Sequence, residues 1–387
     1  MNVGIVCYAS VGGSGIVATE LAKSLAARGH DVHLVSTEPP FRYSEYQPGL
    51  SFHRVHTPAY PLFREPQYVL SLANKIVHVT RDYALDIIHA HYAVPHATAA
   101  YLARQILLAT TPLVRVPQVI TTLHGTDITL VGSDHSYSET VAFSIDRSDG
   151  VTAVSESLRA DTYRALQVHQ DIRVIPNFLD CRVHRRQAAP SLRERYGRGY
   201  EKLAVHVSNF RPVKRPEVLI QVFARIAARV RCRLLLVGDG PELGRAVETA
   251  RTLGVAEHVE CLGEQDQILP LLSISDLFLL TSQQESFGLA ALEAMAAGVP
   301  VVASDVGGLR EVIDHGRSGF LHGLNDIDGM AASGIDVLSD ADLHARVAAE
   351  GVRTVRARFC ADLVVPKYEA FYRELLEQRN GLRAREA

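Results

Sequence analysis

The sequence lacks the features that mark several large classes of protein. No apolar run approaches the roughly 18 residues of a membrane span, and no basic, apolar leader precedes the first predicted strand. We therefore expect neither a membrane span nor a signal peptide. Lysine and arginine total 40 against 43 aspartate and glutamate residues, so the chain has no basic excess of the kind that nucleic-acid binding requires.

Cysteine is sparse, and its spacing forms no recognisable pattern. None of the five cysteines belongs to a CxxC pair, so the sequence predicts neither a disulfide framework nor a zinc site. We expect reduced thiols and a cytoplasmic location. The cysteines are Cys7, Cys181, Cys232, Cys261 and Cys360.

The length of the chain and its apolar runs predict two domains. At 387 residues it is long for one core, given a usual domain size of about 150 residues. Two series of short apolar runs alternate with amphipathic segments, which is typical of parallel sheets with crossover helices. The predicted fold class is α/β, with two doubly wound Rossmann-like domains. We expect the first domain at residues 1–178 with a returning C-terminal helix at 362–387, and the second at 179–361.

The apolar runs also give the expected elements. A glycine loop and a helix at 14–28 follow the first strand, whereas residues 39–66, rich in proline and aromatics, are predicted to form an irregular loop. Strands are expected at 3–7, 32–36, 86–91, 118–123, 150–154 and 173–175, and then at 202–207, 232–237, 258–262, 277–280 and 299–303.

Glycines lie directly between the first predicted strand and the first helix, at Gly12, Gly13 and Gly15. Glycine at this position lets the backbone approach a ligand closely and leaves helix N–H groups for an anion. The loop matches neither G-x-G-x-x-G nor a P-loop. Taken alone, it is equally compatible with a plain tight turn.

Histidines follow two of the predicted strands. His124 comes at the end of strand 118–123, where open parallel sheets bind ligands, although a structural role is equally compatible. His89 and His91 lie on one strand face with His96 five residues further on. No acid or cysteine completes a metal-binding set with them, so we predict no metal site.

An Asp-x-Asp pair occurs at Asp326 and Asp328, a pattern found in manganese-dependent sugar transferases. A helical segment follows it directly, and capping of that helix explains the pair better. We therefore expect neither a metal nor another cofactor.

The second series carries cations and turns at the ends of its strands. Arg211 and Lys214 follow strand 202–207, where two cations would neutralise a diphosphate leaving group. A solvated charge cluster is the commoner explanation for such residues. Turns at Gly238 and Leu262 follow predicted strands, where their backbone amides can contact the base of a nucleotide.

Two carboxylates flank the stretch that follows strand 277–280. Its Ala- and Leu-rich composition predicts a helix entered at Glu285, and eight residues of helix place Glu293 roughly 12 Å away. That distance is about the reach from a ribose to a sugar beyond its diphosphate, and the helix N-terminus favours phosphate. The spacing indicates a nucleotide-sugar site.

Together these motifs resemble glycosyltransferase family 4, retaining enzymes with the two-domain GT-B fold. The resemblance rests on the Glu285-x7-Glu293 element, Gly12-Gly13, His124 and Lys214, and it covers nearly the whole chain. The stretches 7–15, 89–96, 121–129 and 208–215 are similar to one branch of this family. That resemblance implies transfer of N-acetylglucosamine from UDP-N-acetylglucosamine to L-malate, giving the α-glycoside and UDP in bacillithiol biosynthesis.

The resemblance also implies roles for individual residues. Glu293 would accept hydrogen bonds from the ribose hydroxyls, and Glu285 would contact the donor sugar. His124 would lie near the sugar and the β-phosphate. The diphosphate would be handled by Gly13, Gly15, Arg211 and Lys214. Further donor contacts are expected from Asn209, Gly238, Leu262, Ser286, Phe287, Gly288 and Leu289; Asn209 stands where many members of the family have arginine.

The acceptor residues follow from the chemistry of a dicarboxylate, which needs cations or several hydroxyl donors. Ser14, Tyr92 and Thr122 lie at strand ends that face the expected cleft, and Lys75 and Arg42 are the cationic candidates. Catalysis is expected to need both domains, and a homodimer is possible.

Three other functions remain open from the sequence. A family 4 transferase with another acceptor, such as an inositol phosphate, would share the donor residues. A UDP-N-acetylglucosamine epimerase would share the fold and act without an acceptor. A dinucleotide-dependent oxidoreductase would need a G-x-G-x-x-G loop that the chain lacks.

Overall fold

The computed structural model describes residues 1–9, 12–40, 42–43, 46–58, 67–110, 116–132, 134–197, 199–200 and 202–386. For Leu130 and residues 381–386 it describes the backbone alone. The chain divides into two compact units, residues 1–177 with 361–387 and residues 178–360. The boundaries predicted from the sequence lie one residue away from these.

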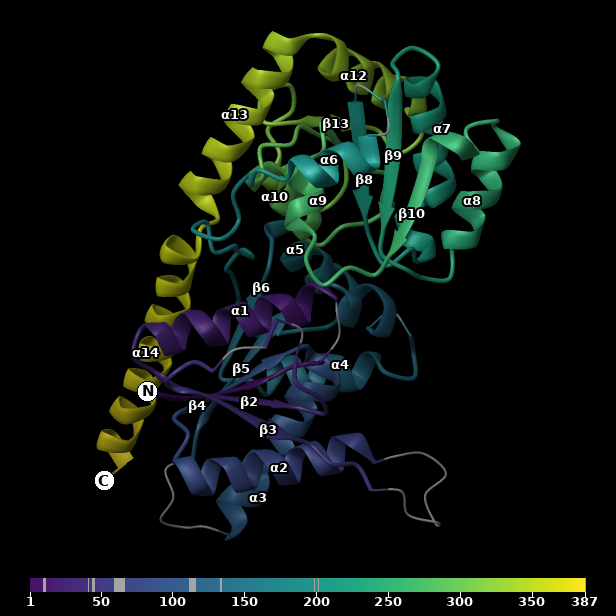
Figure 1. Ribbon diagram of the computed structural model, residues 1–387. Coiled ribbons are helices and arrows are strands. Elements are labelled where there is room, and N and C mark those ends of the chain that lie inside the picture. The colour runs from purple at the N-terminus through teal and green to yellow at the C-terminus, as the bar shows by residue number, and fades with distance from the viewer. Residues whose placement is uncertain are drawn as a thin grey trace. The chain divides into compact units, whose positions relative to one another are not determined.

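Within the described residues, the first unit holds a seven-stranded parallel sheet in the order β3-β2-β1-β4-β5-β6-β7 (Figure 1). Its strands are β1 (Asn2–Val6), β2 (Asp31–Ser36), β3 (Leu50–Arg54), β4 (Ile87–His91), β5 (Gln118–Leu123), β6 (Gly150–Ala153) and β7 (Ile172–Val174). Its helices are α1 (Gly13–Ala27), α2 (Tyr68–Tyr83), α3 (Thr98–Thr110), α4 (Ser138–Asp146), α5 (Glu156–Ala165) and α14 (Ala361–Glu386), with π-helical turns η1 (Ala93–Ala97) and η2 (Asp127–Val131).

The second unit holds, in its described residues, a six-stranded sheet in the order β10-β9-β8-β11-β12-β13. Its strands are β8 (Lys202–Val207), β9 (Cys232–Val237), β10 (Val259–Gly263), β11 (Leu277–Leu280), β12 (Val301–Ser304) and β13 (Phe320–His322). Its helices are α6 (Pro190–Gly197), α7 (Pro216–Ala227), α8 (Leu243–Thr252), α9 (Leu269–Ser273), α10 (Leu289–Ala296), α11 (Leu309–Val312), α12 (Ile327–Ser339) and α13 (Ala341–Arg358), with 3-10 turns η3 (Pro212–Lys214) and η4 (Ala256–His258).

Both sheets are parallel and are covered by helices on both faces, which explains their apolar strands. Strands β4, β5, β9, β11 and β12 are almost wholly buried. In the first unit, α2 and α3 pack together on one face of the sheet and α1 and α14 on the other (Figure 1). No helix in the described part of the chain is long and apolar enough to cross a membrane. The predicted α/β class with two doubly wound sheets is confirmed.

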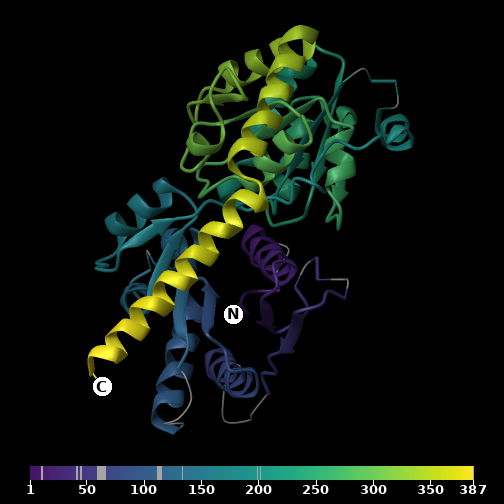
Figure 2. The same ribbon diagram turned by 90° about the vertical axis from the view of Figure 1, so that its left-hand side faces the viewer.

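The C-terminal helix α14 belongs to the first unit, as predicted, and Figure 2 shows it running along that unit. Its Glu369 accepts a hydrogen bond from Arg28 at the end of α1, at 2.9 Å. Its Tyr372 is fully buried and lies 2.7 Å from the Nδ1 atom of His89 in β4. The helix therefore completes the core of the unit in which the chain begins.

Two sequence predictions were wrong about elements. The segment 39–66, predicted to be irregular, contains β3, which pairs with β2 in parallel register; residues 41, 44, 45 and 59–66 lie outside the described part. β3 was missed because its polar residues alternate with apolar ones at a sheet edge. The helix expected from Glu285 begins only at Leu289, because Gly288 has φ +91° and cannot be helical. The estimate of 12 Å along one helix therefore does not apply.

The prediction of five reduced cysteines is also wrong. Cys181 and Cys360 form a disulfide, with their Cα atoms 5.4 Å apart. The bridge joins the first and last turns of the second unit, across 179 positions of sequence, which no local spacing rule reveals. Cys7 and Cys232 are buried free thiols, and Cys261 is exposed.

Reduction of this bridge should lower the free energy of unfolding of the second unit by about 2–4 kcal/mol, because the closed loop of 179 residues restricts the unfolded chain. Thermal unfolding with and without reductant measures the loss. The double variant Cys181→Ser/Cys360→Ser should match the reduced protein, and Cys261→Ser should match the oxidised one. Titration of five thiols in the denatured, unreduced protein, in place of the three free ones, would contradict the bridge.

Candidate active site

Each sheet has one point at which its strand order reverses, and parallel sheets bind ligands at that point, beyond the carboxyl ends of the strands. In the first unit the reversal lies between β1 and β4, and in the second between β8 and β11. The loops that follow these four strands carry most of the residues singled out in the sequence.

In the second unit, Lys214 and Glu285 meet across the reversal point. Lys214 ends η3 after β8, Glu285 lies in the loop after β11, and the Lys214 Nζ atom is 2.5 Å from Glu285 Oε1. The Ser282 hydroxyl donates to the same oxygen at 2.7 Å. Both charged side chains are largely buried, so a cation and a carboxylate are held in fixed positions beside the strand ends.

His206, which the sequence did not indicate, supports the loop that carries Lys214. His206 is fully buried in β8; its Nδ1 atom lies 2.8 Å from the Leu279 carbonyl and its Nε2 atom 2.8 Å from Ser208 Oγ. Burial lowers the pKa of His206 to about 4, so the ring is neutral and serves as a hydrogen-bonding brace. The Ser208 hydroxyl in turn accepts from the Phe210 N–H group.

Two glycines let neighbouring loops approach the site closely. A Cβ atom on Gly238 would lie 1.9 Å from the Ser208 carbonyl oxygen, and its φ is +113°. One on Gly307 would lie 2.1 Å from the Glu285 carbonyl oxygen. Gly238 was expected to present its amide to a base; here its N–H group donates to the Gly263 carbonyl, next to Leu262 at the end of β10.

The other residues predicted to contact the donor lie in the loops that follow β8 and β11. The Arg211 side chain is exposed at the start of η3, and the exposed Asn209 precedes it by two residues. Phe287 is buried, with its ring 5.6 Å from that of Phe359. The turn into α10 is formed by Ser286, Phe287, Gly288 and Leu289.

Glu293 lies within α10, on a face that is almost wholly buried. Its Oε1 atom is 3.7 Å from the Nε2 atom of His184. His184 follows the crossing into the second unit, and nothing in its local sequence marks it as part of a site. Glu285 is in a loop and Glu293 in a helix, so the two carboxylates are positioned by different elements.

In the first unit, Ser14 and Tyr92 meet across the reversal point. The Tyr92 hydroxyl donates to Ser14 Oγ at 2.6 Å, joining the start of α1 to the residue after β4. Burial raises the pKa of Tyr92 to about 12, so the phenol keeps its proton. Tyr92 has φ +94°, a region that costs a non-glycine residue about 1–3 kcal/mol and is found mainly at functional sites. Gly13 and Gly15 open α1 beside this contact.

Aromatic rings to which no role was given lie beside Tyr92. Tyr8 follows β1 and Tyr68 begins α2; the Tyr8 ring centroid is 6.5 Å from that of Tyr68 and 5.7 Å from that of Tyr92. The His96 ring lies 4.4 Å from that of Tyr8. Tyr8 is 40% exposed, so this aromatic cluster presents a hydroxyl-bearing ring to solvent at the carboxyl end of β1.

His89 and His91 in β4, which are fully buried, form a stacked set with the half-buried His124 after β5. The His124 Nε2 atom is 2.9 Å from His91 Nδ1, and the His91 ring stacks on His89 with centroids 4.5 Å apart. Burial lowers the pKa of His89 and His124 to about 3 and that of His91 well below its ordinary value. His124 is therefore neutral and acts through hydrogen bonds. In the described part of the chain, no three His, Cys, Asp or Glu side chains are grouped as metal ligands.

Asp127 joins the two loops that carry these histidines. One carboxylate oxygen accepts from the N–H groups of His124 and Gly125 at 3.3 and 2.9 Å, and the other from Ala93 at 3.3 Å. Burial raises the pKa of Asp127 to about 6 despite these bonds. Sequence reasoning included Asp127 in its motif but assigned it no role.

The other residues expected to bind the acceptor have different surroundings, although the Tyr92 N–H group donates to the Thr122 carbonyl at 3.0 Å. The Thr122 hydroxyl is fully buried, 2.7 Å from His89 Nε2 and 2.6 Å from Thr152 Oγ1, so it belongs to the core. Lys75 lies seven residues after Tyr68 in α2, roughly 10 Å along the helix axis. Arg42 receives a bond from Lys23 Nζ at its backbone carbonyl.

The buried histidines predict how stability depends on pH. Their folded pKa values, about 3 for His89 and His124 and about 4 for His96, lie below the unfolded value of about 6.5. Their contribution is fully present above pH 6.5 and is lost as the pH falls through 4 to 3, because the unfolded state binds more protons. Asp127 has the opposite sign, but it is a single group.

We therefore expect the urea midpoint to fall steadily from about pH 6.5 to pH 4. His89→Gln should remove one titrating group and reduce the slope of unfolding free energy by about 1.4 kcal/mol per pH unit. A midpoint independent of pH in this range would refute the assignment of buried neutral histidines.

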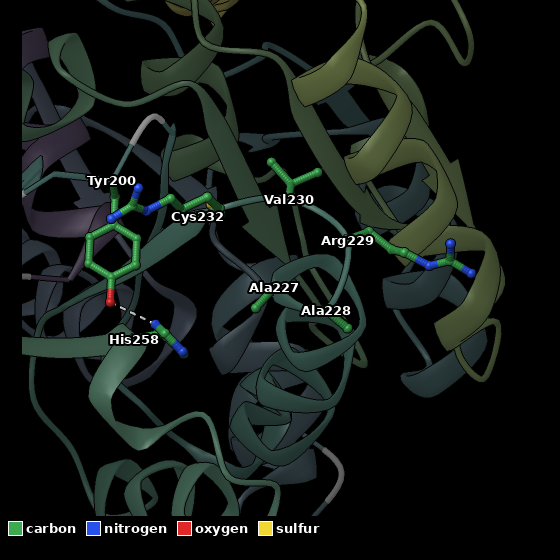
Figure 3. Close-up of a pocket in the computed structure, with 8 residues that line it drawn as sticks. Tyr200, Ala227, Ala228, Arg229, Val230, Cys232 and His258 are labelled. Atoms are coloured by element: carbon green, nitrogen blue, oxygen red, sulfur yellow. Dashed lines mark hydrogen bonds between the residues drawn. The ribbon is translucent and has the colours of Figure 1, made fainter.

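A pocket of about 270 Å³ lies at the opposite edge of the second sheet (Figure 3). It is lined by residues that precede β8, β9 and β10, including Tyr200, Val230 and His258. The Tyr200 hydroxyl is hydrogen-bonded to His258 Nδ1 at 2.7 Å. This pocket is at the amino ends of the strands and is separate from the Lys214–Glu285 contact.

Comparisons with known proteins place the chain in a family. A model described as Glycosyltransferase Family 4 matches residues 11–183, and one described as Glycosyl transferases group 1 matches residues 190–353. The chain is 43% identical to the N-acetyl-alpha-D-glucosaminyl L-malate synthase of Bacillus anthracis over 383 residues, which covers 98% of this chain and 99% of that protein.

Other similarities are partial or concern the fold. The D-inositol 3-phosphate glycosyltransferase of Thermobispora bispora is 33% identical over 189 residues, 46% of this chain and 44% of that protein. The structure of Anabaena Alr3699/HepE in complex with UDP and glucose has a TM-score of 0.79 at 20% identity, and the match covers 97% of this chain and 100% of that one.

The match to one synthase decides the family, because its 43% identity extends over both units and the segments that connect them. The two family models match one unit each, and the solved structures have the same two-sheet architecture. These findings confirm the resemblance seen in the motifs. The chain belongs to glycosyltransferase family 4 and has the GT-B fold.

Proposed function

We propose that the protein is a retaining glycosyltransferase that moves N-acetylglucosamine from UDP-N-acetylglucosamine to the hydroxyl of L-malate. The observation that carries the proposal is the Lys214–Glu285 contact at the reversal point of the second sheet, where a cation for a diphosphate lies beside a carboxylate for sugar hydroxyls. The full-length similarity to the Bacillus anthracis synthase supports the choice of both substrates.

On the donor side, Lys214 and Arg211 stabilise the negative charge that develops on the departing diphosphate. Glu285 uses its second oxygen to orient sugar hydroxyls, since Lys214 and Ser282 both contact Oε1. Glu293 accepts hydrogen bonds from the ribose. We propose that these two cations take the place of a metal, so turnover should persist in chelator.

On the acceptor side, the start of α1 and the hydroxyls of Ser14, Tyr92 and Tyr8 receive the malate carboxylates. A helix of fifteen residues presents N–H groups and a partial positive charge at its start, which favours an anion. Tyr92 keeps its proton and donates it to Ser14 Oγ, which leaves the Ser14 hydroxyl proton for a malate carboxylate. His124, which is neutral, contributes a hydrogen bond to the transferred group instead of a charge.

The reaction then requires no covalent intermediate. The bond from the sugar C1 to the diphosphate breaks while the malate oxygen bonds to C1 on the same face. The malate hydroxyl proton passes to the departing diphosphate oxygen, so the products are the α-glycoside and UDP. The protein contributes orientation and stabilisation of the leaving group.

The proposal is tested by incubating the protein with UDP-N-acetylglucosamine, with and without L-malate, and analysing the products by mass spectrometry. We expect UDP and the malate conjugate only when both substrates are present. A further incubation replaces malate by an inositol phosphate, and a conjugate formed there but not with malate would assign another acceptor. A new sugar nucleotide without acceptor would assign an epimerase, and either result would overturn the proposal.

A further inference from the structure

We infer that His184 is a positioning residue that holds the Glu293 carboxylate for the donor ribose. The inference rests on the ribose role proposed for Glu293 and adds a residue that neither the motifs nor the family comparison assigns. It concerns contacts within the second unit alone.

The neighbours of Glu293 within α10 are apolar. The side chain is 4% exposed, and its neighbours in α10, namely Ala291, Leu292, Ala294 and Met295, are all buried. A carboxylate removed from water is costly unless a cation or hydrogen-bond donors compensate. His184 Nε2 faces Glu293 Oε1 at 3.7 Å, and its own side chain is only 9% exposed.

The direction of the His184 ring is fixed by a backbone contact. Its Nδ1 atom lies 3.1 Å from the carbonyl oxygen of Asp180, so Nδ1 carries a proton and donates it. Nε2 is therefore the atom turned toward Glu293. At 3.7 Å the contact is too long for a hydrogen bond, and it is an ion pair when Nε2 also carries a proton, because a neutral ring would turn its Nε2 lone pair toward the carboxylate.

The turn that carries His184 is itself anchored. The His184 N–H group donates to the Asp180 carbonyl at 2.8 Å, and the Asp180 carboxylate pairs with Arg182. Cys181 in the same turn is bonded to Cys360, and the Leu179 N–H group donates to the Phe359 carbonyl at 2.9 Å. His184 thus reaches Glu293 from a support that is independent of α10.

Two conservative substitutions of His184 distinguish the role of its Nδ1 atom from that of its Nε2 atom. His184→Asn keeps a donor near the Nδ1 position for Asp180 and removes the group facing Glu293. His184→Gln keeps a polar group near the Nε2 position. Both are compatible with the polar turn, and thermal unfolding is measured to check that each variant folds.

The test measures the affinities of UDP and 2′,3′-dideoxy-UDP by calorimetry, because only UDP carries ribose hydroxyls. His184→Asn should weaken UDP binding roughly tenfold and leave dideoxy-UDP binding unchanged, whereas His184→Gln should restore much of the difference. Glu293→Gln should show the same selective loss. His258→Asn, at a hydrogen-bonded histidine on the other edge of the sheet, should change neither affinity (Figure 3).

The outcomes separate the two assignments. If Glu293→Gln is selective and His184→Asn is not, the ribose role stands and the positioning role is wrong. If His184→Asn weakens both nucleotides equally, His184 is structural and the inference is overturned. If Glu293→Gln leaves the preference for UDP unchanged, the proposed ribose role itself fails, and the inference with it.

Discussion

Replacing Lys214 by alanine should lower kcat about 100-fold or more while the fold stays intact. The reason is the position of its ammonium group, 2.5 Å from Glu285 at the reversal point of the second sheet, where it would balance the charge on the departing diphosphate. The measurement is the rate of UDP release with saturating donor and L-malate. Lys214→Arg should retain part of the rate, since it keeps the charge in a different geometry.

Two controls separate the role in catalysis from loss of stability. Lys202→Ala removes a lysine from the first residue of the same strand, β8, at the opposite edge of the sheet, and should leave the rate unchanged. Because Lys214→Ala leaves the Glu285 carboxylate without its cation, Lys214→Ala/Glu285→Gln tests whether that carboxylate causes the loss. Near-normal turnover of Lys214→Ala would remove Lys214 from the mechanism.

Replacing Asp127 by alanine should destabilise the first unit by about 3 kcal/mol or more and abolish most of the activity. The carboxylate accepts bonds from three backbone N–H groups in the loops after β4 and β5, and each buried donor left unpaired costs about 1–3 kcal/mol. Chemical unfolding and the transfer assay measure the two effects. Activity falls because the same loops position Tyr92 and His124.

The control and the pH dependence make this prediction specific. Asp134→Ala removes an exposed aspartate that bonds the Ser136 N–H group nearby, and it should have little effect on either measurement. Asp127→Asn removes the titration: between about pH 6 and 4, protonation of Asp127 offsets part of the stability that the buried histidines lose, so the variant should lose stability more steeply than the wild type as the pH falls. An Asp127→Ala variant as stable as the wild type would refute the role.

Most of the fold could be predicted because it depends on local pattern. The strands at Gln118–Leu123, Lys202–Val207, Cys232–Val237 and Leu277–Leu280 were predicted to the residue, since buried parallel strands are continuous apolar runs. β3 was not predictable in this way, because it is an edge strand with mixed polarity. The start of α10 depends on one backbone angle at Gly288, which the helix-forming residues around it conceal.

The site could be predicted only where strand ends mark it. Lys214 and Glu285 each follow a strand, so their meeting follows from the strand order once that order is known. His206, which supports the loop of Lys214, and His184, which faces Glu293, contact Leu279 and Glu293, which are far from them in sequence. The Cys181–Cys360 bridge is beyond local sequence for the same reason.

The most direct test of the account follows the stereochemistry of the product. Nuclear magnetic resonance of the mixture of protein, UDP-N-acetylglucosamine and L-malate shows the anomeric proton of the conjugate from the first turnovers. We predict an α-glycoside of malate that appears together with UDP, and no β anomer at early times. Formation of the β-glycoside, or UDP release without any malate conjugate, would contradict retaining transfer to malate.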